Sequence, residues 1–155
     1  MTADETYEYF TQFWLDENGK RLGGLWRRRG DDLEHVSVTD WAWHPLANPL
    51  DAPHPNTVEQ ITEHQAAELL EDRQRFVQYW VSHDSGRPMI YRRLTSPEIT
   101  IDEVFGLKNR WIPTGTIREF RAAGPHQKPG LVPIDAETAE RTIRETRDIS
   151  GVTRL

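Results

Sequence analysis

The residues best suited to chemistry are a run of aromatic and arginine side chains that occurs twice. Ring faces beside guanidinium groups suit an anionic ligand or single-stranded nucleic acid. The same residue types also fit strands whose arginine stems cover aromatic rings, and the acidic surroundings of the first run favour this structural interpretation. The runs are Trp26, Arg27, Arg28 and Arg29, and then Tyr91, Arg92 and Arg93.

A second group of candidates is acidic and lies around the start of a proline-rich stretch. Exposed carboxylates attract a basic protein and speed its association, and tryptophan is frequent at binding hot spots. We therefore expect an electrostatic face for a basic partner here, with plain solubility as the alternative use of the charges. Its members are Asp31, Asp32, Glu34, Asp40 and Asp51, together with Trp41.

Catalytic and metal-binding motifs give little support for an enzyme. The chain has no cysteine, which excludes thiolate nucleophiles and thiolate metal sites. It has no G-x-S-x-G, no phosphate-binding glycine loop and no H-E-x-x-H. His44 and His54 flank the proline-rich stretch, but packing or surface roles suit them better than metal binding. We predict no catalytic residue, no metal and no cofactor, although a carboxylate-based site leaves no signature in sequence.

Charge is unevenly distributed along the 155 residues, of which 19 are basic and 25 acidic, a net of −6. The part up to Arg75 has 7 basic and 15 acidic residues, a net of −8, and the rest has 12 and 10, a net of +2. The acidic first half favours basic partners and disfavours nucleic acid. With no apolar stretch long enough for a membrane span and no signal-like N-terminus, we expect a cytoplasmic location and no membrane partner.

The chain also resembles itself. Four blocks recur in the same order, which predicts an internal duplication. The alternative is that two aromatic-rich segments align through composition alone. The matched blocks are Tyr9–Leu15 with Arg75–Val81, Leu25–Arg28 with Ile90–Arg93, Trp43–Pro45 with Trp111–Pro113, and Val58–Thr62 with Leu131–Asp135.

Each copy is predicted to be three or four antiparallel strands followed by one helix, an α+β plan. In the first copy the strands are Tyr7–Leu15, Leu22–Arg29 and Leu33–Trp43, with a hairpin turn at Asn18-Gly19. A helix from Glu63 to about Arg73 follows, with Thr62 and Gln65 as a capping box, and Asp135 caps its counterpart. We expect the copies, residues 7–74 and 75–149, to pack into one pseudo-symmetric domain over residues 1–155, as one sheet or two.

Three functions remain open at this point. The favoured one is a non-enzymatic protein-binding module, such as an acidic inhibitor or immunity-type protein for a basic partner. The second is a small enzyme or ligand-binding domain with its site between the copies. The third is nucleic-acid binding through the aromatic–arginine runs. The segment Ala122–Gly130 is a candidate recognition loop, and the oligomeric state is not indicated.

Overall fold

The computed structural model describes residues 6–16, 19–48, 50, 52–123 and 130–155. It is an α+β protein with two five-stranded antiparallel sheets and three α-helices. The chain divides into two compact units, of which the first contains Met1–Phe76 and Thr95–Thr100 and the second Val77–Leu94 and Ile101–Leu155. Among the helices of the described ranges, none has the length and apolar character needed to cross a bilayer.

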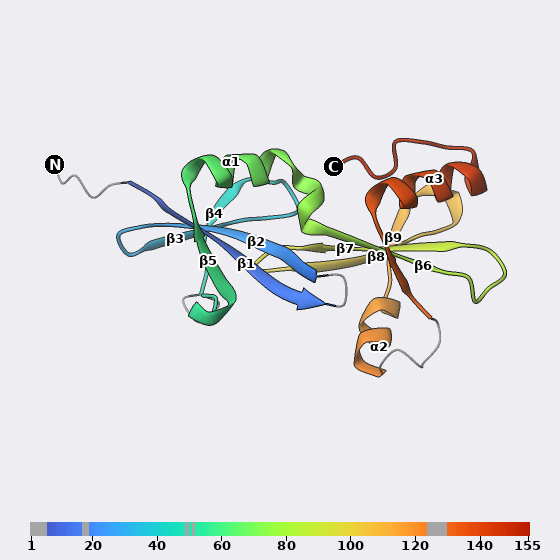
Figure 1. The fold of residues 1–155 in the computed structure, drawn as a ribbon, viewed down its shortest axis with the longest axis horizontal. Helices are drawn as coiled ribbons and strands as arrows, with labels where there is room; N and C mark the ends of the chain where they lie inside the picture. Colours follow the sequence, from blue (N-terminus) through green and yellow to red (C-terminus); the bar gives the residue numbers. More distant parts are fainter. Residues whose placement is uncertain (1–5, 17–18, 49, 51, 124–129) are drawn as a thin grey trace. The chain divides into compact units, whose positions relative to one another are not determined.

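The first sheet has the strand order β4-β3-β2-β1-β5 (Figure 1). The long third strand expected over Leu33–Trp43 is instead two short strands, because the chain reverses between them. At this reversal the Trp41 amide donates to the Ser37 carbonyl, and Trp41 has a φ of 57°. The strands are β1 (Glu8–Asp16), β2 (Gly19–Arg29), β3 (Asp32–Val36), β4 (Trp43–Pro45) and β5 (Val58–Ile61).

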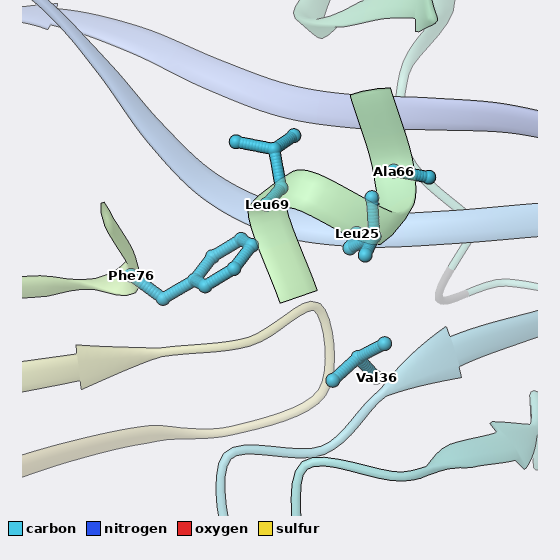
Figure 2. Close-up of a cluster of buried hydrophobic side chains, with 5 residues drawn as sticks. All are labelled: Leu25, Val36, Ala66, Leu69 and Phe76. Atoms are coloured by element: carbon cyan, nitrogen blue, oxygen red, sulfur yellow. The ribbon is translucent and has the colours of Figure 1, made fainter. Parts of the chain in front are cut away.

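Helix α1 (Glu63–Glu71) covers one face of this sheet. Its predicted capping box is present: the Gln65 amide donates to Thr62 Oγ1 at 3.1 Å and the Thr62 amide donates to Gln65 Oε1 at 2.9 Å. The helix ends at Glu71, slightly before the predicted end, and a 3-10 turn at Arg73–Phe76 follows. The buried core beneath it consists of Leu25, Val36, Ala66, Leu69 and Phe76 (Figure 2).

The opposite face of the first sheet is contacted by the segment Thr95–Thr100, which belongs to the first unit although it continues from β7 (Met89–Thr95) of the second sheet. A Cβ at Gly24 would lie 3.0 Å from the Pro97 ring, so the sheet and this segment are in close contact. The buried His35 side chain has its Nε2 3.2 Å from Glu98 Oε1. The first sheet is therefore covered on both faces, as its many large apolar residues require.

The second sheet has the order β10-β6-β7-β8-β9, which is the same arrangement of consecutive strands as in the first sheet. Helix α3 (Ala136–Arg147) follows β10 just as α1 follows β5, and Asp135 caps it by accepting the Thr138 amide at 2.7 Å. The strands are β6 (Val77–Ser82), β7 (Met89–Thr95), β8 (Thr100–Phe105), β9 (Trp111–Pro113) and β10 (Val132–Ile134).

Helix α2 (Thr116–Ala123) has no counterpart in the first unit and was not expected from the sequence. Its Ile117 is fully buried against Trp80 and Tyr91 of the second sheet. On α3, Ala139 and Ile143 are buried. The second core therefore draws on α2 as well as on the predicted helix. The predicted loop Ala122–Gly130 lies largely outside the described residues.

Candidate partner-binding site

Three of the predicted acidic residues meet at one hollow in the first unit. Asp31, Asp32 and Glu34 line a depression of ≈ 560 Å³ at the β2–β3 turn, which we call the acidic hollow. A tight turn creates it: Arg29 pairs with Asp32, and Gly30 between them has a φ of 61°, a conformation that glycine adopts readily. The remaining wall is formed by Tyr7, Arg28, Arg29, Gly30, Leu33, Pro45, Leu46 and Ala52.

The carboxylates of Asp31 and Asp32 are the available negative charges of the hollow. Both residues are exposed, and neither forms an ion pair with any residue in the described part of the chain. Two adjacent unpaired carboxylates on an exposed turn attract a cationic group with little cost of desolvation. These two residues can therefore recognise a lysine or arginine side chain.

Glu34 has a different role, because its charge is already compensated. Arg27 Nε donates to Glu34 Oε1 at 2.6 Å, and each side chain is 20% exposed. The Arg27 guanidinium also lies 4.1 Å from the Tyr7 ring centre and 4.4 Å from the Trp43 ring centre. Glu34 thus helps to shape the wall of the hollow and contributes little net charge.

Tyr7 and Arg29 line the hollow but were not predicted as site residues. The Arg29 guanidinium lies 4.8 Å from the Tyr7 ring centre. A signal was available, because Tyr9 pairs with Arg27 and the same antiparallel register places Tyr7 near Arg29. Arg28 is held by Glu8 at 2.5 Å, whereas Arg29 has only the ring contact among the described residues and keeps its positive charge at the wall of the hollow.

The other predicted partner-binding residues do not line the acidic hollow. Asp40 lies in the β3–β4 turn, where the hydrogen bond from the Ala42 amide and the neighbouring His44 lower the pKa of its carboxyl. Trp41 is partly buried and packs against the first core, with its ring centre 5.9 Å from that of Phe76. Asp51 lies outside the described residues.

The aromatic rings of the two arginine runs are covered. Trp26 is 1% exposed and Tyr91 is 8% exposed. Stacking of a nucleic-acid base needs an open ring face. The burial of both rings therefore weighs against their use as a stacking platform, and it agrees with the structural interpretation of the runs.

The second arginine run is also largely neutralised by carboxylates. Arg92 Nε donates to Glu103 Oε1 at 2.9 Å, and its guanidinium lies 4.2 Å from the Trp111 ring centre. Arg93 binds Asp102 through two hydrogen bonds of 2.7 and 2.9 Å. Such paired guanidinium groups offer little free charge to a phosphate.

Two of the histidines are neighbours, since His35 and His44 are cross-strand partners with ring centres 6.2 Å apart, whereas His54 forms a separate local contact. His44 Nε2 lies 2.7 Å from Asp40 Oδ2, and His54 Nδ1 accepts the Asn56 amide at 3.2 Å. His35 is 1% exposed, and its Nδ1 has no hydrogen-bond partner in the described structure. Within the described ranges, no three histidine or carboxylate side chains are grouped as metal ligands would be.

The two units differ more in net charge than the two halves of the sequence do. The first unit has 7 basic and 16 acidic residues, a net of −9, because Thr95–Thr100 adds Glu98 to it. The second has 12 basic and 9 acidic residues, a net of +3. The acidic hollow therefore lies on the unit that attracts cations over long range.

Comparisons with protein-family models, with curated proteins and with solved structures give no match for this chain. The structure itself defines an α+β protein with two five-stranded sheets. The candidate site is the acidic hollow at the β2–β3 turn of the first sheet.

Proposed function

We propose that this chain is a cytoplasmic, non-enzymatic protein-binding module that binds a basic protein at the acidic hollow, as an inhibitor or immunity-type protein would. The observation that supports this most is the pair of exposed, unpaired carboxylates of Asp31 and Asp32 at a hollow of ≈ 560 Å³. The net charge of −9 on the same unit adds long-range attraction for a basic partner.

The hollow offers both charge and shape to a basic side chain. Its volume lies within the range of about 300–1,000 Å³ that is typical of small-molecule pockets, so a lysine or arginine side chain has ample room. The two aspartates provide the charge, and Tyr7, Pro45 and Leu46 provide apolar surface for the stem of a lysine or arginine. Binding at such a place is expected to be fast and sensitive to salt.

The test is the affinity of a fluorescent octa-arginine peptide, measured by anisotropy between low and physiological salt. We expect Asp31→Asn with Asp32→Asn to weaken binding about five- to tenfold at low salt, since each exposed ion pair contributes up to about 1 kcal/mol. The salt dependence should become shallower in the same variant.

The matched control removes two other charges from the same unit. Glu63 and Glu71 lie on α1, are exposed and form no ion pair with other described residues. Glu63→Gln with Glu71→Gln should change the affinity less than twofold. Equal weakening by both double variants would mean that only net charge matters, and an unchanged affinity in the aspartate variant would contradict the assignment of the hollow.

We also propose that the two units are two copies of one ancestral strand–helix unit. A group of four side chains supports this: an arginine that pairs with a glutamate on the next strand, lies against a tryptophan, and stands opposite a tyrosine in the neighbouring strand. The groups are Tyr9, Arg27, Glu34 and Trp43 in the first unit, and Tyr79, Arg92, Glu103 and Trp111 in the second.

Strand register supports the same proposal and adjusts the sequence alignment. Tyr9 stands opposite Ile61 of β5, and Tyr79 stands opposite Ile134 of β10. Tyr9 therefore corresponds to Tyr79 and not to Arg75, four residues earlier. The shift arises because the paired arms of the hairpin are longer in the first unit: Asp16 is seven residues beyond Tyr9, whereas Ser82 is three residues beyond Tyr79.

A further inference from the structure

Strand β5 is an edge strand whose second side is not paired with any described strand. It is the last strand of the order β4-β3-β2-β1-β5 and pairs only with β1, through Tyr9–Gln12. An edge strand presents backbone N–H and C=O groups to which another extended chain can add.

The other edge strands carry a feature that prevents such addition. Each contains a proline, which lacks the amide hydrogen that a new strand would need. These are Pro45 in β4, Pro113 in β9 and Pro133 in β10. The sequence of β5 is Val-Glu-Gln-Ile, without proline, so it is the one edge among the described strands that lacks this protection.

The register shows which group of β5 is available. Gln60 in β5 and Pro133 in β10 occupy equivalent positions. Each is one residue before the isoleucine that faces a tyrosine, Ile61 in the first sheet and Ile134 in the second. A proline in an edge strand has its nitrogen directed away from the sheet. By this equivalence the Gln60 amide is directed away from β1, toward an incoming strand.

A groove of ≈ 540 Å³ lies on the α1 face of the sheet, lined by Glu59 and Ile61 of β5, by Thr11 and Leu22 of the two inner strands, and by Leu69 of α1. Since side chains alternate between faces, every second residue of an added strand would lie on this face, beside Glu59 and Ile61.

The charged rim of this groove is already paired within the chain. Lys20 binds Glu59, Arg75 binds Asp72 and His64 binds Glu68, while Arg21 also has an interaction of its own. The charges around the groove therefore favour neither an acidic nor a basic peptide. The net charge of −9 on the unit selects a basic segment and disfavours a second copy of the same acidic unit.

We infer that β5 is a strand-addition site for an extended segment of a basic partner, with apolar residues at alternate positions. This inference rests on the proposed function. Tyr9 stands opposite both Arg27 and Ile61, which are therefore two strand spacings or about 10 Å apart. Asp31 and Asp32 lie beyond Arg27 at the same end of the sheet, so the acidic hollow is about 16 Å from the end of β5. One segment of about ten residues, about 33 Å long when extended, can reach both.

The test compares two fluorescent peptides of equal charge, one alternating arginine with valine and the other the same peptide methylated on every backbone nitrogen. The second has no amide hydrogen and cannot donate the backbone hydrogen bonds of a strand. We expect the arginine–valine peptide to bind the unmodified protein about tenfold more tightly. Gln60→Pro should abolish this difference, while Gln60→Ala, which keeps the amide, should preserve it.

The outcomes separate the two proposals. If neither peptide binds, both the proposed function and the strand addition are wrong. If both bind equally well to the unmodified protein, the basic-partner function stands and strand addition is wrong. If sedimentation shows a dimer that Gln60→Pro dissociates, β5 pairs with a second copy and the inference is also overturned.

Folding of Gln60→Pro is checked by circular dichroism, and the position equivalent to it in β10 carries a proline. Should the variant fail to fold, the comparison of the two peptides on the unmodified protein carries the test. The fully methylated peptide should bind about tenfold more weakly than its parent, and equal binding would overturn the inference.

Discussion

At the scale of single residues, Glu140 shows how one carboxylate fixes the end of the chain. Its Oε2 accepts the Gly151 amide at 2.9 Å, and its Oε1 accepts the Thr153 amide at 3.1 Å and Thr153 Oγ1 at 3.0 Å. Partial burial raises the pKa of Glu140. The hydrogen bonds from Thr153 and Gly151 together lower the pKa by more than burial raises it, so the pKa is below its ordinary value.

Glu140→Gln should lower the free energy of unfolding by about 1–2 kcal/mol at pH 7, because hydrogen bonds to a charged acceptor are replaced by weaker ones. The pKa of Glu140 is lower in the folded than in the unfolded chain. Its contribution is therefore complete above about pH 5 and is lost as pH falls through the folded pKa.

Urea denaturation between pH 3 and pH 7 measures this effect. The difference between the unmodified protein and Glu140→Gln should shrink as the pH falls below about 4. Thr153→Val removes the hydroxyl that donates to Glu140 but keeps the carboxylate, so its unfolding free energy is compared with that of Glu140→Gln. A difference that stays constant over the whole pH range would show that the charge of Glu140 is not involved.

At the scale of the elements, local signals were predictable and long-range ones were not. The capping box of Thr62 and Gln65 and the cap at Asp135 depend on residues three apart, and both are present. Strand β5 is only four residues long and is defined by its pairing with β1, which no local pattern reveals. Helix α2 was missed for a similar reason, since its Ile117 acquires its role only from the sheet it packs against.

The candidate site divides in the same way. Asp31 and Asp32 were predictable because a Gly-Asp-Asp turn places them on the surface. The burial of Trp41 was not, because its position depends on Phe76, which is 35 residues away in the sequence. Composition alone does not show that Arg27 and Arg92 are enclosed by carboxylates and rings contributed by other strands.

The two arginine–glutamate pairs give the duplication proposal a quantitative test. Double-mutant cycles with Arg27→Met and Glu34→Gln, and with Arg92→Met and Glu103→Gln, should give similar coupling energies of about 1–2 kcal/mol. Both pairs are about four-fifths buried or more, so screening by solvent is limited in each. A coupling in one sheet and none in the other would contradict the equivalence of the two groups.

At the scale of the whole molecule, the distribution of charge is the property that most constrains function. One unit has a net charge of −9 and the other +3. The acidic unit also holds the acidic hollow and the edge strand without proline. We propose that the acidic hollow and the open strand edge of this unit together bind a basic polypeptide.

The most direct test of this account is affinity purification from the native cell at low salt, with mass spectrometry of the retained material. Three baits are compared: the unmodified protein, Asp31→Asn with Asp32→Asn, and Glu63→Gln with Glu71→Gln. We expect a stoichiometric basic polypeptide on the first and third baits, released as salt rises and depleted on the second. No retained polypeptide, or the same material on all three baits, would contradict binding at the acidic hollow.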